Sequence, residues 1–350
     1  MPELLQASRV PPGKPGQPYT LEYLCGEVIY LPSTKSCFRL LVTGRETHNA
    51  FAVLGQGGIG SDPIGFHYHR DAHDIFLVVK GFINVWADDQ CRTLGPGDYA
   101  SVPPNIVHQY QVLGDYTEYL SLIVPGGWED FFRVIGESYS GPLFRVEDDR
   151  KVSEVLFPKV LEAAKTFDVI RVPDHPYVAP QPWDDEKDVL PGDVRPYFLK
   201  AGTGPRYLIG GLVCSPLSGV AEAAGRFELG CLEGSSWHEP SILSNQMSFD
   251  SVHHAFSVVE GAVEILLEQA TLARVNTGET AYVPPGTFFS VKIVSRYAKV
   301  YIWTSGAGLV GVLCKIGSLY KHTVPPEEAG PWEKSDLMTV AKEIAMKVID

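Results

Sequence analysis

Residues 74–81 read DIFLVVKG, and residues 254–261 read HAFSVVEG. Each octamer contains β-branched apolar residues and ends at a glycine, as a strand followed by a turn does. A second matched pair follows in the same order and at nearly the same spacing, with GPGDYASVPPN at 95–105 and GETAYVPPG at 278–286. Two matched segments in one order indicate that this chain is a duplication of one β domain.

The strands of the first copy show the alternation of half-buried β-structure. In INVWADD, the apolar residues Ile83, Val85 and Ala87 fall on one face. The chain also has 34 glycines and 27 prolines, spread over many places, which suits short strands joined by frequent turns. The sequence therefore predicts an all-β chain of two tandem domains, each with the turn rhythm of a sandwich or barrel.

The predicted domains follow from this repeat. We expect a first barrel at 1–146, a helical and Pro-rich linker at 147–195, a second barrel at 196–333 and a C-terminal helix at 334–350.

Two segments outside the barrels have helical patterns. Residues 151–168 can form a helix that Pro158 interrupts, and a Pro-rich stretch at 172–193 follows it. The C-terminal helix is expected to begin at a Ser-Asp cap at 335–336. Its apolar face would carry Leu337, Val340, Ile344 and Val348.

The composition narrows the possible partners and location. A net charge of −13 argues against nucleic acid or an anionic membrane as partner. The N-terminal residues lack the apolar core of a signal peptide, and no asparagine lies in a glycosylation sequon. The six cysteines are scattered without C-x-x-C spacing. We therefore expect a cytoplasmic protein, monomeric or homodimeric, with mostly buried thiols.

Histidines are concentrated just before the first octamer, in FHYHRDAHD at 66–74. Alternate residues of a strand face the same way, so His67 and His69 project together. Asp74 begins the next strand and can converge with them if its side chain faces the barrel interior. His108 is a fourth candidate, on a face that continues to Tyr110.

Three imidazoles and a carboxylate inside one barrel could hold a transition metal. An isolated H-x-H pair also occurs among surface histidines, so the pair alone does not decide. The spacing of His69, Asp74 and Gly81, followed by Pro103 and His108, is more specific than the pair.

These residues resemble the two motifs of the cupin superfamily, G-x5-H-x-H-x3–4-E-x6-G and G-x5-P-x-G-x2-H-x3-N. The segments GDYASVPPNIVHQYQV, IVPGGWEDFF and FLKAGTGPRYL are more specifically similar to those of the fungal quercetin 2,3-dioxygenases, which are flavonol-cleaving bicupins. The resemblance extends from about Pro18 to beyond Gly306. It departs at Asn105, which stands where the superfamily motif has glycine but which the flavonol-cleaving relatives share.

The resemblance implies a bicupin, with two tandem jelly-roll-like β-barrels and one mononuclear copper site in the first barrel. It also implies oxygen-dependent opening of a flavonol ring with release of carbon monoxide. His67, His69 and His108 fall on the three histidine ligands, and Asp74 falls on a glutamate that is both ligand and base. Aspartate is one methylene shorter, which takes its carboxylate further from the metal.

Other residues of the first copy receive roles from the same alignment. Phe38, Phe76, Tyr110 and Tyr119 would line the substrate pocket, although each could be plain core. His73 precedes Asp74 and points to the opposite face by strand alternation. We expect it to be solvated or to support the site without ligating, and a local bulge would instead make it a ligand.

The second copy lacks the ligand set. His254 lies at the carboxylate position and Phe289 at the third histidine position, with no H-x-H pair before them. We expect no metal there, and we expect His253 and His254 to lie at the surface or between domains. The fungal relatives also have an empty second barrel.

Three function classes remain open. The first is a metal-dependent dioxygenase that cleaves a flavonol, or a related phenolic or polyketide-derived enol, with O2. The second is a redox-neutral isomerase, dehydratase or cyclase that uses the metal as a Lewis acid. The third is a non-catalytic ligand-binding bicupin. Copper follows from the resemblance, and iron, nickel, manganese, cobalt and zinc also remain possible.

Overall fold

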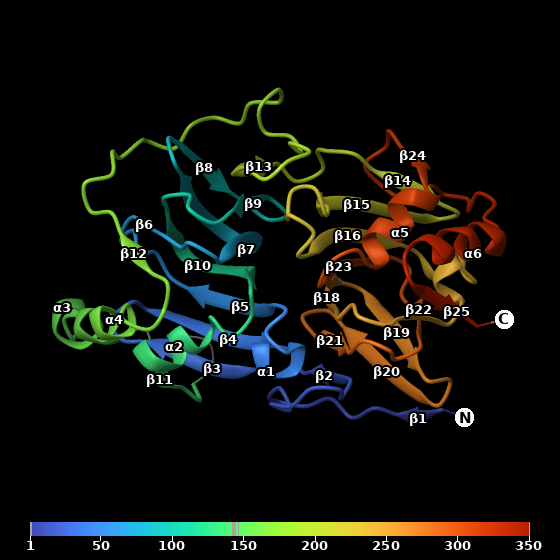
Figure 1. Cartoon of the computed structure of the whole chain (residues 1–350), viewed down its shortest axis with the longest axis horizontal. Coiled ribbons are helices and arrows are strands. Elements are labelled where there is room, and N and C mark those ends of the chain that lie inside the picture. Colours follow the sequence, from blue (N-terminus) through green and yellow to red (C-terminus); the bar gives the residue numbers. More distant parts are fainter. Residues whose placement is uncertain (1, 142–144, 146, 350) are drawn as a thin grey trace. The chain divides into compact units, whose positions relative to one another are not determined.

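The computed structural model describes residues 2–141, 145 and 147–349, and the chain divides into two compact units (Figure 1). The first unit is Cys25–Thr203. The second unit joins Met1–Leu24 to Gly204–Asp350. Both units are built mainly of strands, which confirms the all-β class expected from the repeat.

The first unit carries the predicted site and most of its elements are strands. Its elements are β3 (Glu27–Leu31), β4 (Ser36–Val42), α1 (Gly44–Thr47), β5 (Ala52–Gly58), β6 (His67–Tyr68), β7 (His73–Ala87), β8 (Gln90–Leu94), β9 (Tyr99–Val102), β10 (His108–Val124), α2 (Asp130–Ile135), β11 (Glu137–Ser138), α3 (Val152–Val155), α4 (Phe157–Ala163), β12 (Ile170–Arg171) and β13 (Tyr197–Leu199). The main path of its sheet is β11-β3-β4-β5-β10-β7-β9-β13, while β8 pairs with β7 and β6 joins β10 to β12.

Gly81 bends a strand rather than ending it. The sequence predicts two strands separated by a glycine turn, but β7 continues through this residue and pairs with β10 on both sides. Gly81 has a φ of +69°, which favours glycine. A Cβ here would lie 2.2 Å from Oγ1 of Thr117, so the close approach of the two strands also requires glycine.

The helices of the predicted linker belong to the first unit and cover its sheet. Phe38 and Leu40 of β4 share one apolar cluster with Phe131 of α2 and with Leu156 and Ala163 around α4. The helical conformation is interrupted at Leu156, between α3 and α4. Pro158 occupies the first turn of α4, where its missing N–H is tolerated. The expected interrupted helix is therefore present and forms a wall of the unit.

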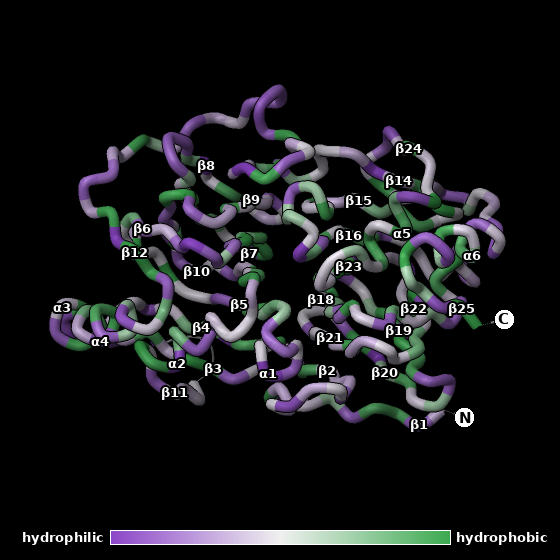
Figure 2. The backbone as a smooth tube through the Cα atoms, in the orientation of Figure 1, coloured by the Kyte–Doolittle hydropathy of each residue, from purple (hydrophilic) through white to green (hydrophobic). Residues whose placement is uncertain are grey.

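The Pro-rich segment after β12 is held against the first unit by specific contacts. It has no regular secondary structure, and hydrophilic residues predominate along it between β12 and β13 (Figure 2). Trp86 donates its indole N–H to the carbonyl of Val178. The guanidinium of Arg92 donates two hydrogen bonds, each 3.0 Å, to the Asp188 carboxylate. Both side chains of this ion pair are 4% exposed.

The second unit repeats the architecture in two sheets. Its elements are β1 (Glu3–Leu4), β2 (Tyr19–Leu21), β14 (Tyr207–Ile209), β15 (Leu212–Ser218), β16 (Glu228–Gly234), η1 (Ser236–His238), η2 (Ile242–Ser244), β17 (Met247–Phe249), β18 (His254–Glu260), β19 (Ala262–Leu267), β20 (Thr271–Asn276), β21 (Thr280–Val283), β22 (Phe289–Ile293), β23 (Ala298–Thr304), α5 (Leu309–Ile316), β24 (Ser318–Leu319), α6 (Lys334–Glu343) and β25 (Met346–Val348). The sheet orders are β1-β20-β19-β22-β17-β25 and β2-β21-β18-β23-β16-β15-β14-β24.

The unit boundaries differ from the predicted domains at both ends of the first barrel. β1 and β2 lie in the predicted first domain, but they pair with β20 and β21 of the second unit. Conversely, β13 lies after the predicted linker, yet it pairs with β9 of the first unit. The repeat shows which segments are alike but not which partner each edge strand pairs with. The predicted boundary at Val146 lies outside the described residues.

The C-terminal helix is shorter than expected. α6 ends at Glu343, and Met346–Val348 forms β25, which pairs with β17. The N-cap is Glu333, with no side-chain capping bond, so the expected Ser-Asp cap was wrong. Leu337 and Val340 are buried as predicted.

Two expectations about the whole chain can be compared with the described residues. Within them, no helix is long and apolar enough to cross a membrane. All six cysteines lie in this part of the chain, no disulfide joins them, and four are buried.

The buried ion pair of the Pro-rich segment yields a stability prediction. Asp188→Ala leaves the Arg92 guanidinium buried without its counter-charge, and we expect a loss of about 3–5 kcal/mol in the free energy of unfolding. The matched control is Asp193→Ala, which removes an ion pair with Arg195 that is more than half exposed and should leave stability close to wild type. Urea denaturation of the three proteins measures the difference, and equal midpoints for both variants would contradict the assigned role of Asp188.

Candidate metal centre

Three histidines converge at one end of the first unit. His67 lies on β6 and His108 at the start of β10, and the two residues are direct partners in the antiparallel pairing of these strands. His69 follows β6 and returns to the same side after Tyr68, as alternation predicts. Ring nitrogens of all three histidines lie within 4.8 Å of one another. Among the described residues, these three histidines are the one group of His, Cys, Asp or Glu side chains close enough together to share a metal ion.

The backbone fixes the rings of His67 and His108. Nδ1 of His67 lies 2.9 Å from the carbonyl oxygen of Gly65, and Nδ1 of His108 lies 2.9 Å from that of Ile106. A carbonyl oxygen only accepts, so each Nδ1 carries the proton and donates it. Nε2 of each ring then keeps a free lone pair, which is the form that binds metals.

Asp168 holds the third ring and was not among the residues predicted from the sequence. His69 donates its Nδ1–H to the carbonyl oxygen of Asp168, just before β12. The Asp168 carboxylate accepts the backbone N–H groups of Arg70 and Asp71, the latter at 3.0 Å. No sequence signal marks this residue, because its main role is played by a backbone carbonyl that any residue would provide.

Asp74 faces two of the three rings. Its Oδ2 lies 3.2 Å from Nε2 of His108 and 3.4 Å from Nε2 of His69. The side chain is 16% exposed. The structure therefore brings all four residues of the predicted ligand set to one centre, with the shorter aspartate side chain reaching two of the histidines.

The charges of this centre depend on one another. Burial would raise the pKa of Asp74, but His69 and His108 lower it well below its ordinary value. Burial likewise would lower the pKa of His69, but Asp74 raises it. Burial and the neighbouring His108 and His69 lower the pKa of His67 well below its usual range. An ionised carboxylate thus faces imidazoles that lie too close together to be charged independently.

This donor set fits a metal ion. Lone pairs of His108 and His69 at Nε2 point toward the carboxylate of Asp74, an arrangement that needs a proton or a cation between them. A metal about 2.1 Å from two imidazole nitrogens would separate those nitrogens by roughly 3–4 Å, which is within the observed spread. Three neutral histidines leave such an ion cationic and leave coordination positions open.

A cavity of about 980 Å³ opens onto these residues. Three of the four predicted pocket residues line it, namely Phe38, Phe76 and Tyr110. Tyr119 is not among the lining residues. It is buried beside them and donates its hydroxyl proton to Oε1 of Gln56, which does line the cavity.

The two phenols beside the cavity are neutral at physiological pH. Burial raises the pKa of Tyr110 to about 12. Burial also raises the pKa of Tyr119 well above its usual value, and Tyr110 raises it further. Both side chains therefore act as hydrogen-bonding groups, not as charges.

Trp128 is a further cavity residue that was not predicted from the sequence. The centroid of its ring lies 4.7 Å from that of His69 in an edge arrangement, so the indole packs against the imidazole of this proposed metal ligand. Its Nε1–H is buried and has no acceptor among the described residues, at a cost of about 1–3 kcal/mol. The indole stands in the segment IVPGGWEDFF, but nothing in that segment marks the tryptophan itself.

His73 is neither solvated nor part of the cluster. The residue is fully buried, and its Nε2 lies 2.7 Å from Oγ of Ser101. Its side chain points to the face of β7 opposite Asp74, as alternation predicts, so the alternative of a ligating bulge does not apply.

Comparison with known proteins agrees with this geometry. The family model described as "Cupin domain" matches residues 54–123, which include all four residues of the centre. The match identifies residues 54–123 as similar to a cupin domain. A quercetin 2,3-dioxygenase from Aspergillus japonicus is 28% identical to this chain over 298 residues, covering 77% of this chain and 84% of the relative.

Two further similarities are more limited. A quercetin 2,3-dioxygenase from Bacillus subtilis is 31% identical over 167 residues, which cover 48% of this chain and 47% of the relative. The solved structure of oxalate decarboxylase from Bacillus subtilis matches with a TM-score of 0.50 over 85% of this chain and 78% of that one. At 13% identity this match shows the bicupin fold alone.

The second unit has different residues at the corresponding centre. The expectation of surface histidines there was wrong, because His253 and His254 are buried. The backbone N–H of Leu309 donates to Nε2 of His254, and Nδ1 of the same ring lies 3.2 Å from the carbonyl of Val252. Burial lowers the pKa of His254 to about 3. Phe289 packs against it, with ring centroids 5.2 Å apart.

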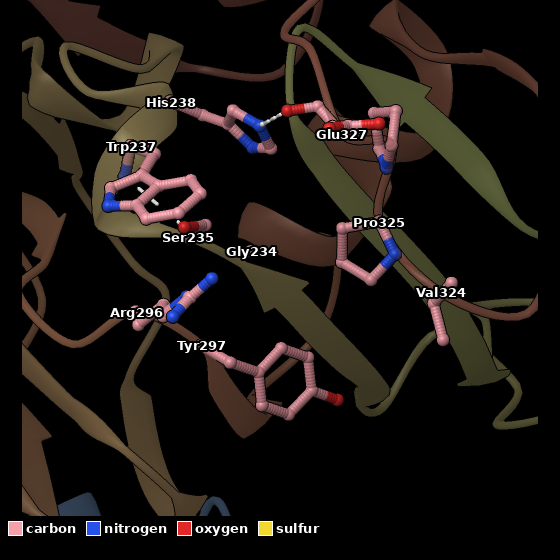
Figure 3. Close-up of a pocket in the computed structure, with 10 residues that line it drawn as sticks. Gly234, Ser235, Trp237, His238, Arg296, Tyr297, Val324, Pro325 and Glu327 are labelled. Carbon is pink, nitrogen blue, oxygen red and sulfur yellow. Dashed lines mark hydrogen bonds between the residues drawn. The ribbon is translucent and has the colours of Figure 1, made fainter.

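A separate pocket of about 240 Å³ lies elsewhere in the second unit (Figure 3). Trp237, Arg296 and Tyr297 line it, with the guanidinium of Arg296 lying 4.4 Å from the centroid of the Trp237 ring. Its one histidine, His238, has its Nε2 3.0 Å from the carbonyl of Glu327. A single imidazole does not make a metal site.

The histidine cluster predicts one transition metal per chain, bound in the first unit. His108→Ala removes one of three imidazole ligands, and most of the metal should be lost. His322→Ala is the control, since this histidine is exposed and lies outside the cluster. Elemental analysis of the purified proteins measures the metal. A fully metallated His108→Ala protein, or a wild-type ratio near two metals per chain, would contradict the assignment.

Proposed function

We propose that this protein is a metal-dependent dioxygenase of the cupin type that cleaves a flavonol, or a related enolic phenolic compound, with O2. The observation that carries the proposal is the position of Asp74 and the three histidines, which open together onto a cavity with several aromatic side chains in its wall. The similarity to two quercetin 2,3-dioxygenases supports the same reaction class.

The cavity is suited to a flat aromatic ligand. Phe38 stacks on Phe132 with ring centroids 4.0 Å apart, and Trp128 and Phe131 continue the aromatic lining. Such walls bury ring faces and exclude water from the centre. The volume of about 980 Å³ is at the upper end of the range for small-molecule sites and accommodates a tricyclic compound.

His67, His69 and His108 would hold the metal, which when bound would supply a Lewis acid and a redox-active ion next to the substrate oxygen. Copper is our first choice, while iron, nickel, manganese, cobalt and zinc suit comparable ligand sets. The backbone bonds at Nδ1 keep the three rings in one orientation. The chain thus contributes a fixed, neutral donor set.

Asp74 is placed to accept the substrate's hydroxyl proton. Its Oδ2 faces Nε2 of His69 and His108, so an enol oxygen that approached the same centre would lie within reach of the carboxylate. Removal of this proton makes the substrate electron-rich, as reaction with O2 requires. The aspartate therefore acts as general base, and the histidines position the group it deprotonates.

Oxygen uptake tests the reaction class. With a flavonol and metal-loaded protein, we expect loss of the flavonol absorbance to match O2 consumption and carbon monoxide release. The reaction should stop in anaerobic buffer and after removal of the metal by a chelator. Turnover that continues without O2 would instead indicate a redox-neutral isomerase, dehydratase or cyclase. Protein that binds no metal as purified would favour a ligand-binding bicupin.

Substitution of Asp74 tests the base. Asp74→Asn is nearly isosteric but cannot accept the proton, and turnover at saturating metal should fall by about 10²–10⁴-fold. Asp115→Asn, at an exposed position of β10, is the matched control. A role confined to orienting His69 or His108 would lower metal affinity by about 10–100-fold with near-normal turnover once metal is saturating. That outcome would rule out Asp74 as the base.

The longer carboxylate provides a complementary variant. Asp74→Glu moves the carboxylate about one methylene toward the centre and should tighten metal binding. Metal titration of the apoprotein measures the change, and weaker binding would show that the site is shaped for aspartate.

A further inference from the structure

A chain of buried polar side chains lies inside the first unit, away from the histidine cluster. Tyr119 donates its hydroxyl proton to Oε1 of Gln56, and Nε2 of Gln56 donates to Oγ of Ser121 at 2.8 Å. Tyr110 is hydrogen-bonded to Tyr119. Tyr119, Gln56 and Ser121 are at most 6% exposed.

This polar chain borders the same cavity as the metal centre. Gln56, Ser121 and Tyr110 line that cavity together with His67 and Asp74. The amide of Gln56 has two N–H donors and two acceptor lone pairs, and the bonds above use one of each. The remaining donor and acceptor are available to a ligand in the cavity.

The strand register fixes how far these polar side chains lie from Asp74. On β10, Ile123 is the partner of Asp74, Ser121 of Phe76, and Tyr119 of Val78. Ser121 is therefore two residues from the Asp74 level and Tyr119 is four, which corresponds to roughly 7 and 13 Å along the strand. Gln56, on β5, is the strand partner of Tyr119 and therefore lies about as far from the Asp74 level as Tyr119 does. That span matches the length of two or three fused or linked aromatic rings.

The second unit shows that the fold itself does not need polar residues at these positions. On β23, Val300 pairs with Val258 and Ile302 with Phe256, as Tyr119 and Ser121 do with the matching residues of β7. Leu232 is the partner of Val300 on β16, where the first unit has Gln56. Leu232, Val300 and Ile302 all belong to the apolar core of the second unit.

The contrast between the units therefore separates a structural from a ligand-binding explanation. Burying an amide and a phenol in an aromatic cavity costs free energy that leucine and valine would not incur. The second unit, which lacks the histidine cluster, has apolar residues at these positions. The first unit has polar residues there, in the wall of the cavity that contains the metal centre.

We propose that Gln56, held in place by Tyr119 and Ser121, binds an oxygen substituent at the end of the substrate remote from the histidine cluster. The ligand class is a planar aromatic enol of two or three rings with a second hydroxyl or carbonyl group roughly 7–13 Å from the enol oxygen. This inference rests on the proposed function, because it takes the enol end to lie at Asp74. Gln56 contacts the ligand, while Tyr119 and Ser121 are positioning residues.

Equilibrium binding without oxygen tests this inference independently of turnover. The ligands are 3-hydroxyflavone, which carries the enol alone, and its derivatives with added hydroxyls on the fused ring or on the pendant ring. Calorimetry with metal-loaded wild-type protein in anaerobic buffer should show at least one hydroxylated derivative binding about tenfold more tightly than 3-hydroxyflavone. This ratio is the magnitude expected of one buried hydrogen bond.

Two variants test whether this affinity ratio depends on Gln56 and Tyr119. Gln56→Leu introduces the residue that the second unit has, and Tyr119→Phe removes only the hydroxyl that holds the amide. Either substitution should reduce the affinity ratio to within about twofold. Ser257→Ala is the matched control, because it removes a buried hydroxyl in the second unit that accepts a hydrogen bond from Trp303; its ratio should equal that of wild type. Metal content and melting temperature are measured for each protein, and the milder Tyr119→Phe decides if Gln56→Leu does not fold.

The outcomes separate this inference from the proposed reaction. An unchanged ratio in folded, metal-loaded variants would overturn the inference even if O2 uptake confirms the dioxygenase. Absence of measurable binding for every flavonol tested would also overturn it. A ratio that is present in wild type and lost in the variants, with no O2 uptake, would support the distal contact while contradicting the dioxygenase.

Discussion

The hydrogen bonds from histidine Nδ1 atoms to backbone carbonyls are the constraint on which the site depends. Without them, the three imidazoles could rotate or exchange tautomers, and their Nε2 lone pairs would not point to one centre. The carbonyl acceptors come from three different segments, at Gly65, Ile106 and Asp168. The loop before β6, the turn before β10 and the segment after α4 must therefore all be in place before the donor set exists.

This dependence explains which parts of the site could be predicted from the sequence. Strand alternation and motif spacing were enough to select His67, His69, Asp74 and His108, because each is placed by local strand geometry. Asp168 was out of reach, since it is distant in sequence and acts partly through its backbone. The fold class was similarly accessible from the repeat. The pairing of the edge strands could not be predicted, because the hydrophobic pattern does not specify which neighbouring strand a short segment joins.

The two units show how one scaffold can hold different interiors. In the first unit, one face of the ladder between β7 and β10 carries Asp74, Tyr119 and Ser121. The equivalent face of the second unit has His254, with its Nε2 bonded to a backbone N–H, and then the apolar residues Phe256, Val258, Val300 and Ile302. The second unit thus has a packed core where the first has a lined cavity. Strand pairing is retained in both, which allowed the side chains of the interior to diverge.

The strands β2 and β13 tie the two halves of the duplication together through the chain. β2 precedes the first unit in sequence but completes a sheet of the second, and β13 follows the linker but completes the sheet of the first. A truncation at the repeat boundary would leave β9 or β21 with an open edge of unpaired N–H and C=O groups, which invites intermolecular pairing and aggregation. Loss of either copy during evolution would carry the same penalty. Such reciprocal edges offer a physical reason why a barrel without the histidine cluster would persist beside one that has it.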